Sequence, residues 1–358
     1  MASRAQPRRR VSIRDIADAA GVSLTTVSHA LNGKGRVQPQ TRERIFALAA
    51  ELGYSANPHA QRLATGRHMM IAVQISGFGG KALATDSAYF VDVLNSVSAA
   101  ALDHGYTAVL AAPDMHPRDV DAFAVDGAIV VDPTGEEPLL TTLARRGAPV
   151  VTTGRVLDGD VTSGWVDNDL RKAAVKVLDH FLEAGYERPA ILTGPLSRSY
   201  AADTLDAYEQ WARERGIRPV SVAVRTGMSA AAAMRAAEQL LGRRERPDAV
   251  YAMLDVLALA TAHVARRRGL TVPGDLGIAA AFDSEVLRWA DPPLTAFDLH
   301  PARIGREAVE LLTAVLADRA PRQRSVTVPA RLITRASTDR SGSGSGSASA
   351  AGSGRAAG

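Results

Sequence analysis

The hydrophobic positions between residues 12 and 31 follow two helical repeats that are separated by a glycine. The first repeat has four apolar residues spaced three or four positions apart, which predicts an amphipathic helix. These residues are Ile13, Ile16, Ala17 and Ala20. Ser12 precedes the repeat as a helix N-cap, and Gly21 follows it where the chain must reverse direction. We therefore expect a helix, a tight turn and a second helix.

The second helix is expected to begin after a Ser23 cap and to bury Val27 and Leu31. Its opposite face carries side chains that could meet base edges in a DNA major groove. We assign seven residues to this surface: Ser23, Leu24, Thr25, Thr26, Ser28, His29 and Asn32. Leu24 could contact a thymine methyl group, whereas His29 could reach either a guanine or only a phosphate.

From residue 71 onward, short apolar runs alternate with amphipathic helical stretches. This alternation predicts parallel sheets wound with helices, and the length leaves room for two such sheets. Strands are expected to begin at residues 71, 107, 128, 149, 190, 220, 249, 277 and 294. Helices are expected over residues 89–104, 171–184, 204–215, 229–242, 256–268 and 303–317. Ligands of open α/β sheets collect at the carboxyl ends of the strands, where we expect a cleft.

Charge divides the chain at the same place as the hydrophobic pattern. The whole chain of 358 residues has a net charge of +4, whereas residues 1–67 alone carry +7. A basic N-terminal part fits phosphate neutralisation and salt-dependent DNA binding. Arg8, Arg9 and Arg10 form a basic arm that either contacts phosphates or remains solvated.

Composition and motif searches exclude several other classes of protein. The chain has no cysteine, which rules out disulfides, thiol catalysis and cysteine metal sites and fits a cytoplasmic protein. Its histidines lack metal-ligand spacing, and neither a P-loop nor an HExxH motif occurs, so we expect no cofactor and no catalytic site. Gly77, Gly79 and Ala82 have a dinucleotide-like spacing, but the next helix is predicted only near residue 89. No apolar run approaches membrane-spanning length, so no membrane partner is expected.

Residues 12–67 resemble the N-terminal region of the LacI family of bacterial transcription regulators. The resemblance includes a third helix at residues 39–52, an elbow at residues 54–58 and a segment at residues 58–64 that is similar to the hinge helix of the family. It implies that two hinge segments meet in the minor groove of an operator. The implied contacts are Asn57, His59, Ala60, Leu63 and Ala64. Leu63 resembles a wedge that opens the central base step, although it could instead pack a stable helix against the head.

The order of elements after residue 69 resembles the effector domain of the same family, which is similar to a periplasmic sugar-binding protein with two subdomains around a cleft. The resemblance implies seven effector-binding residues: Tyr89, Phe90, Asp169, Arg198, Thr204, Asp255 and Asp283. Thr204 stands where many members have an arginine, and Leu254 stands where they have an asparagine before Asp255. Residues 113–125 leave room for little more than one helical turn. These departures mean that a typical sugar or purine effector cannot be assumed.

Together, these patterns predict an N-terminal all-α helix-turn-helix head plus an α/β periplasmic-binding-protein-like effector domain of two doubly wound parallel-sheet subdomains. The expected boundaries are a basic arm at residues 1–10, the head at 11–56, the hinge helix and linker at 57–68, the effector-binding and dimerisation domain at 69–338, and a disordered Ser/Gly/Ala tail at 339–358. The resemblance implies a homodimeric repressor that binds a palindromic operator under the control of a small molecule, such as a sugar or a related metabolite. Two alternatives stay open: a DNA-binding regulator without a ligand, and an enzyme acting on a sugar or nucleotide.

Overall fold

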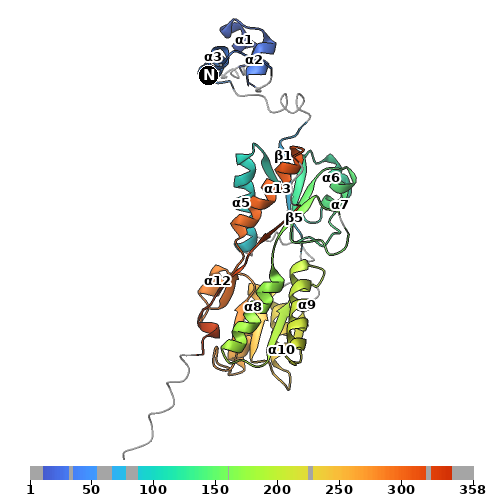
Figure 1. Cartoon of the computed structure of the whole chain (residues 1–358), viewed down its shortest axis with the longest axis vertical. Coiled ribbons are helices and arrows are strands. Elements are labelled where there is room, and N and C mark those ends of the chain that lie inside the picture. Colours follow the sequence, from blue (N-terminus) through green and yellow to red (C-terminus); the bar gives the residue numbers. More distant parts are fainter. Residues whose placement is uncertain are drawn as a thin grey trace, which may run out of the picture. The chain divides into compact units, whose positions relative to one another are not determined.

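The computed structural model of the protein describes residues 11–31, 35–54, 67–77, 88–159, 161–224, 229–319 and 324–340. The chain divides into two compact units, Met1–His68 and Met69–Gly358. The first unit is helical, and the second is built from sheets and helices (Figure 1).

The first unit packs three helices around a small apolar core. The helices are α1 (Ile13–Ala20), α2 (Leu24–Leu31) and α3 (Pro39–Glu51). Ser12 and Asp15 form a capping box at the start of α1, because the Ser12 N–H donates to the Asp15 carboxylate at 2.7 Å. Gly21 ends the helix in the left-handed region with φ 64°. Ile16, Val27 and Ile45 are buried at the centre, as the helical spacing predicted for the first two helices.

The second unit contains two six-stranded sheets. The first sheet has the strand order β11-β5-β4-β3-β1-β2, and all of its strand pairs are parallel. Its strands are β1 (Met70–Ile75), β2 (Thr107–Leu110), β3 (Gly127–Val131), β4 (Val150–Thr153), β5 (Gly164–Asn168) and β11 (Ser325–Val328). Its helices are α5 (Ala88–Asp103), α6 (Pro117–Ala122), α7 (Pro138–Arg145) and α13 (Pro301–Leu316). This sheet and its helices form the first subdomain.

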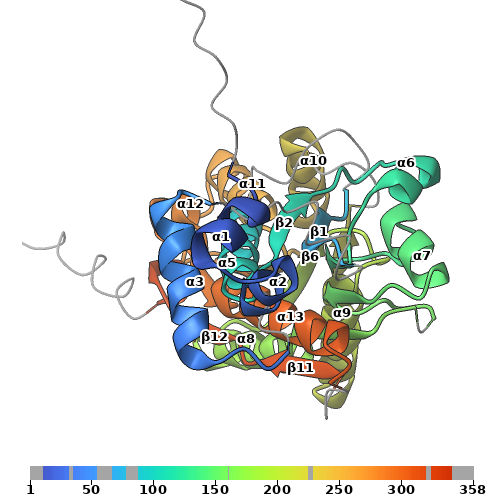
Figure 2. The same ribbon diagram turned by 90° about the horizontal axis from the view of Figure 1, so that it is seen from above.

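Helices cover both faces of the first sheet because both sets of alternating strand residues are apolar. Ile71 and Val73 of β1 pack with residues of α5 and α13, whereas Ala72 packs with residues of α6 and α7. Figures 1 and 2 show α5 and α13 side by side on one face and α6 and α7 on the other. Because helices cover both faces of the sheet, only the ends of its strands remain open to a ligand.

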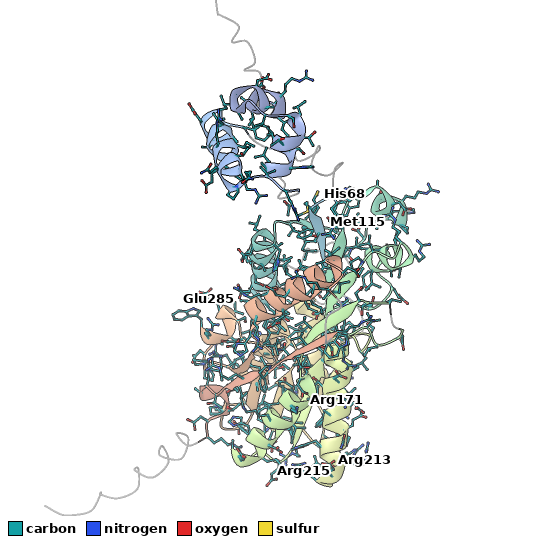
Figure 3. All side chains as sticks on the ribbon, turned by 45° about the horizontal axis from the view of Figure 1, so that its top comes forward. His68, Met115, Arg171, Arg213, Arg215 and Glu285 are labelled. Atoms are coloured by element: carbon teal, nitrogen blue, oxygen red, sulfur yellow. The ribbon has the colours of Figure 1, made fainter. Side chains whose placement is uncertain are left out.

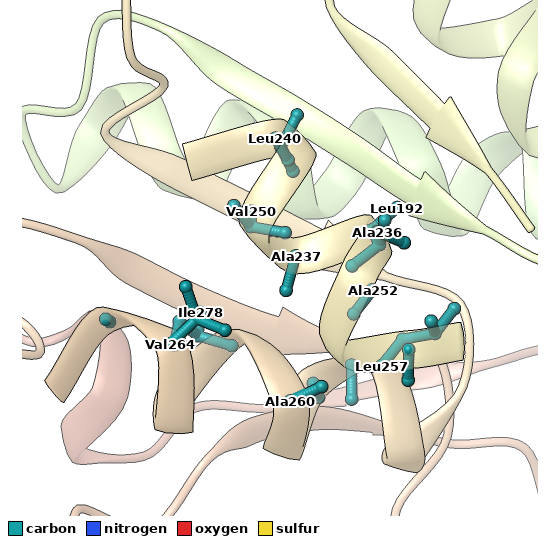
Figure 4. Packing of buried hydrophobic residues seen from close by; sticks show 14 of the residues in the cluster. Leu192, Ala236, Ala237, Leu240, Val250, Ala252, Leu257, Ala260, Val264 and Ile278 are labelled. Carbon is teal, nitrogen blue, oxygen red and sulfur yellow. The ribbon is translucent and has the colours of Figure 1, made fainter. Parts of the chain in front are cut away.

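The second subdomain repeats this arrangement with the order β12-β10-β9-β8-β6-β7, in which only β12 runs antiparallel to its neighbour. Its strands are β6 (Pro189–Thr193), β7 (Ser221–Ala223), β8 (Ala249–Ala252), β9 (Gly277–Ala280), β10 (Thr295–Asp298) and β12 (Arg331–Ile333). Helices α8 (Leu170–Glu183) and α9 (Ser199–Glu214) cover one face. Helices α10 (Ala230–Leu241), α11 (Asp255–Arg267) and α12 (Glu285–Arg288) cover the other, as Figure 4 shows for α10 and α11. A short 3-10 helix, η2 (Ala336–Thr338), follows β12.

Each strand and each helix that the sequence predicted for the second unit is present. The sequence did not predict α7, α12, β5 or β11, because α7 and α12 are short, β5 has only two adjacent apolar side chains, and β11 alternates polar with apolar residues. Helix α9 begins at Ser199, five residues before the predicted start. The short helix α6 fits the limited space predicted for residues 113–125.

The folded body also includes Asp339 and Arg340, which the sequence assigns to the C-terminal tail. Arg340 donates hydrogen bonds to the carbonyls of Gly185 and Gly274, and its guanidinium lies over the ring of Tyr186. Asp339 directly follows η2. Residues 341–358 lie outside the described ranges. None of the helices in the described part of the chain has the length and apolar character that a membrane crossing requires.

Candidate functional site

The outer face of α2 presents exposed side chains at the start of the helix. Leu24 is 41% exposed, and Thr25 is also exposed. The Ser23 hydroxyl accepts the N–H of Thr26 at 3.1 Å and lies 2.8 Å from the Thr26 hydroxyl, so Ser23 caps the helix and positions Thr26. Because Val27 and Ala30 are buried on the opposite side, the face with Leu24 and Thr25 remains accessible to a partner.

The remaining residues assigned to this surface differ in their surroundings. Ser28 and His29 are partly buried. His29 packs closely on the backbone at Gly35, where a Cβ atom would lie 2.6 Å from the ring Nδ1. Gly35 also has φ 69°, so both space and backbone geometry favour glycine there. Asn32 lies outside the described residues, as do the expected hinge contacts Asn57, His59, Ala60, Leu63 and Ala64.

A narrow pocket in the second unit is lined by residues of both subdomains, at the carboxyl ends of the strands. The loops and helices after β1, β3, β5, β6, β8, β9 and β10 all contribute to it. Its lining residues are Tyr89, Phe90, Asp132, Asp167, Asn168, Leu170, Tyr200, Met253, Leu254, Ala281, Phe282 and Leu299. This is the position at which ligands of open α/β sheets bind.

Of the expected effector residues, Tyr89 and Phe90 line this pocket. Asp169 instead caps α8, where its carboxylate accepts the Lys172 N–H at 3.1 Å and forms an ion pair with the Lys172 amine at 2.7 Å. Arg198 is buried at the start of α9 and donates from Nη2 to the carbonyl of Gly77 at 2.7 Å. Arg198 therefore links the two subdomains close to the pocket without lining it.

The other three expected effector residues are buried or form hydrogen bonds within the protein. Thr204 is fully buried within α9. Asp255 begins α11, and its carboxylate accepts the N–H of Val256 at 2.7 Å. Asp283 is held by two arginines, because its Oδ2 accepts hydrogen bonds from Arg288 Nε and Arg335 Nη2, each at 2.9 Å. None of these three is among the residues that line the pocket in the described part of the chain.

Two carboxylates that the sequence analysis did not select line the pocket. Asp132 follows β3 in the left-handed region with φ 49°, and Asp167 lies in β5. Burial raises the pKa of Asp167 to about 7, although the Asn168 N–H opposes the shift, and the nearby Asp132 adds to it. Burial also raises the pKa of Asp132 to about 6, against the opposing charge of Arg198. The sequence signal for Asp132 was an acid directly after the strand predicted to begin at residue 128, whereas Asp167 had no such signal because β5 was not predicted.

Aromatic side chains form the apolar wall of the pocket. The Tyr89 ring contacts Phe90 edge to face, with centroids 5.4 Å apart, and lies 5.8 Å from Phe282. The Tyr200 hydroxyl is buried and has no hydrogen-bond partner among the described residues. Burial and the charge of Asp132 raise the pKa of both Tyr89 and Tyr200 well above the ordinary value, so both hydroxyls stay protonated.

Polar contacts join the subdomains beside the pocket. The guanidinium of Arg155, which follows β4, forms an ion pair with Asp203 of α9. The main-chain N–H of Arg155 donates a hydrogen bond to the Ser199 hydroxyl at 3.1 Å. The Ser199 hydroxyl in turn donates to Asp167 at 3.5 Å. Within the second subdomain, Arg171 of α8, labelled in Figure 3, pairs with Asp203 and Asp206 of α9. The described residues contain no group of three or more side chains that could hold a metal ion.

Comparisons with known proteins cover both units of the chain. The model for bacterial regulatory proteins of the LacI family matches residues 12–57, and the model for a periplasmic binding protein-like domain matches residues 178–338. The HTH-type transcriptional regulator CelR of Thermobifida fusca is 30% identical over 337 residues, which span 91% of this chain and 96% of that protein.

Two solved structures have the same fold. A transcriptional regulator CelR–cellobiose complex is 26% identical, with a TM-score of 0.69, over 92% of this chain and 100% of that chain. A lac repressor dimer bound to operator and the anti-inducer ONPF is 23% identical, with a TM-score of 0.75, over the same shares of the two chains. The predicted combination of a helix-turn-helix head with a periplasmic-binding-protein-like body is thus confirmed. The relatives named here are transcriptional regulators and not enzymes, and this chain belongs to the LacI family of bacterial regulatory proteins.

Proposed function

We propose that the protein is a transcriptional repressor that binds a palindromic operator as a homodimer, with an operator affinity set by a small molecule in the pocket. One observation carries the proposal: a regulator from Thermobifida fusca aligns with 91% of the chain, including both the helical head and the two-subdomain body. A DNA-bound regulator of this kind acts in the bacterial cytoplasm. The pocket then serves as a control site and not as an active site.

In this proposal, α2 enters the major groove. The exposed Leu24 and Thr25 contact base edges, while the capping residues Ser23 and Thr26 hold the start of the helix in place. Leu24 offers only an apolar contact, for which a thymine methyl group is the favourable partner. The hinge residues, with Leu63 as the wedge, would contact the minor groove at the centre of the operator.

The homodimer follows from the size of the head. A single three-helix head makes too few contacts for tight and specific binding, and a two-fold symmetric dimer doubles them on an inverted repeat. The related lac repressor has been solved as a dimer bound to operator, which supports the same arrangement here.

Control by a small molecule requires that the ligand bind two conformations with different affinity. The pocket is suited to this because its lining residues come from both subdomains, so a ligand that fills it contacts both. The solved CelR complex contains cellobiose, which supports a small-molecule ligand for this chain as well.

Selection of binding sites from random DNA, followed by anisotropy titrations, tests the DNA-binding part of the proposal. We expect one inverted repeat to be recovered and the full repeat to bind at least about 100-fold more tightly than a half-site. Equal affinity for the half-site and the full site would contradict dimeric recognition. A metabolite screen with operator affinity as the readout tests control by a small molecule. If no metabolite changed the operator affinity, the chain would be a constitutive DNA-binding protein.

A further inference from the structure

The pocket between the subdomains combines two carboxylates with an aromatic wall. Asp132 and Asp167 line it together with Tyr89, Phe282 and Tyr200. Among the residues that the structure describes, no basic side chain forms an ion pair with either carboxylate. A buried carboxylate without a cationic partner is unfavourable when it is ionised. The pocket therefore favours an occupant that brings positive charge.

The nearby guanidinium groups form their ion pairs and hydrogen bonds with other groups, although the charges of Arg198 and Arg155 oppose the raised pKa values of Asp132 and Asp167. Arg155 pairs with Asp203, and Arg171 pairs with Asp203 and Asp206. Arg198 is close enough to influence Asp132, but its Nη2 donates to the carbonyl of Gly77. None of these three arginines lines the pocket. The carboxylates facing the cavity are thus more numerous than the cations facing it, within the described residues.

The pocket also contains a hydroxyl group without a hydrogen-bond partner among the described residues and a main-chain segment with an unusual dihedral angle. The Tyr200 hydroxyl is buried without a partner among the described residues, which leaves an unmet donor and acceptor in the pocket. Asp132 has φ 49°, a conformation that side-chain-bearing residues seldom adopt and that concentrates at binding sites. At Gly154, a Cβ atom would lie 3.4 Å from both Asp132 Oδ1 and the Ser199 hydroxyl, so the absence of a side chain there leaves space beside the acid.

We propose that the pocket binds a small organic ammonium compound, with its protonated nitrogen between Asp132 and Asp167 and its carbon skeleton against Tyr89 and Phe282. Carboxylates form strong charge-assisted hydrogen bonds with an ammonium group, and aromatic faces attract the same cation. A neutral ligand would satisfy the apolar wall, but each of the two carboxyls would then either keep a proton or be ionised without an opposite charge. This inference rests on the proposed function only in identifying the ligand with the effector.

Proton release gives the proposal a characteristic signature. Because burial raises the pKa of Asp167 to about 7 and of Asp132 to about 6, both carboxyls bind protons near neutral pH while the pocket is empty. A bound cation favours the ionised carboxylates, so binding releases protons and strengthens as pH rises from about 6 to 8. A neutral ligand that accepts a hydrogen bond from a protonated acid would show the opposite pH dependence.

Isothermal titration calorimetry of the full chain with two matched pairs of probes tests the proposal. The amines are propylammonium chloride and tyramine, and their neutral counterparts are 1-propanol and tyrosol. We expect each amine to bind at least about tenfold more tightly than its counterpart, with proton release shown by titrations in two buffers of different ionisation heat. Asp132→Asn and Asp167→Asn should each weaken amine binding at least about tenfold, since each removes one charged hydrogen-bond acceptor. Asp206→Asn, which removes an exposed carboxylate of the same helix as Tyr200, should leave binding unchanged.

Amine binding that is no tighter than alcohol binding, or that both Asp→Asn variants leave intact, would overturn the proposal. Thermal unfolding of each variant shows whether the pocket still folds, and the neutral probes then report on its apolar wall. Operator titrations with the same samples separate this inference from the proposed function. If cellobiose changes operator affinity and the amines do not bind, the effector-controlled function stands and the ammonium site fails. If the amines bind but the chain has no operator affinity, the ammonium site stands and the proposed function fails.

Discussion

The side-chain amide of Asn168 donates a hydrogen bond to the main-chain carbonyl of Val328, with a nitrogen–oxygen distance of 2.8 Å. The same amide nitrogen donates to the carbonyl of Leu299 at 3.1 Å. These three residues belong to the three chain segments that pass between the subdomains, after β5, β10 and β11. One buried side chain therefore ties all three crossings together, and both Asn168 and Leu299 also line the pocket.

We expect Asn168→Ala to lower the free energy of unfolding by about 1–3 kcal/mol, because it leaves two buried carbonyls without their donor. Urea unfolding of the full chain measures this difference. Asn168→Asp should be at least as damaging, since a carboxylate cannot donate to either carbonyl. Asn95→Ala, an exposed change on α5, serves as the control and should alter stability by about 0.5 kcal/mol or less. A stable Asn168→Ala variant would show that the crossings are held by other contacts.

Asp283 is predicted to stabilise the folded protein through its hydrogen bonds with Arg288 and Arg335. Its side chain is 8% exposed, and that of its partner Arg335 is 16% exposed. Asp283→Ala leaves Arg335 buried without its carboxylate, so we expect a loss of about 3 kcal/mol in unfolding free energy. Arg288, the second partner, is 57% exposed, and Arg288→Ala should cost about 1 kcal/mol or less. If Asp283→Ala kept full stability and lost only the ligand response, Asp283 would be an effector contact as the family resemblance implies.

Because the pKa values of the two pocket carboxyls are raised, we expect their contribution to the free energy of unfolding to fall as pH rises. The folded pKa values of Asp132 and Asp167, about 6 and about 7, lie above the ordinary value of 3.8. The folded state therefore binds these protons more tightly than the unfolded state, and their contribution is lost as pH rises through the folded pKa values. We expect the Asp132→Asn/Asp167→Asn variant to gain about 4 kcal/mol relative to the wild type between pH 5 and pH 8, because pH 5 lies about one and about two units below the two folded pKa values. Parallel pH dependences of wild type and variant in chemical denaturation would contradict the assigned shifts.

Trp289 is predicted to lie in the interface of the proposed homodimer. It directly follows α12 and is 81% exposed, and Val286 of α12 is 51% exposed, so the two form an uncovered apolar surface. Trp289→Asp should weaken dimerisation by about 2 kcal/mol or more, as for an aromatic residue at the centre of an interface. Sedimentation equilibrium measures the change, and Leu157→Asp, at another exposed apolar residue, should have little effect. A dimer that tolerates Trp289→Asp would place the interface elsewhere.

Leu24 is predicted to contribute to base recognition without contributing to folding. Because its side chain is exposed, Leu24→Ala should leave the melting temperature of the protein nearly unchanged but weaken specific operator binding by about 1–3 kcal/mol. Leu24→Arg should change the preferred base at one position of each half-site. Leu52→Ala, which truncates an exposed leucine at the end of α3, is the matched control in the same unit. An unchanged preferred sequence with Leu24→Arg would show that α2 meets the DNA with a different face.

The amino-acid sequence determined the local structure of this protein. Ser12 and Gly21 mark the ends of α1 because a capping hydroxyl and a left-handed glycine act on their own backbone neighbourhood. The strands of the sheet interiors were equally predictable, since continuous apolar runs such as residues 128–131 can be buried only between two layers of helices. Strands β5 and β11 were not predicted because both lie towards the edge of the sheet and lack a continuous apolar run: β5 has only two adjacent apolar side chains, and β11 alternates polar with apolar residues.

Only the tertiary structure decided which acids face the pocket. In the segment VDND at residues 166–169, the sequence favoured Asp169 as the ligand contact. The structure continues β5 through Asn168, so Asp167 reaches the pocket, whereas Asp169 caps α8 and pairs with Lys172. Asp132 joins Asp167 from a strand more than thirty residues away in the chain. Local patterns set which residues form helices and strands, but the charge balance of a pocket depends on side chains that only strand pairing and subdomain packing bring together.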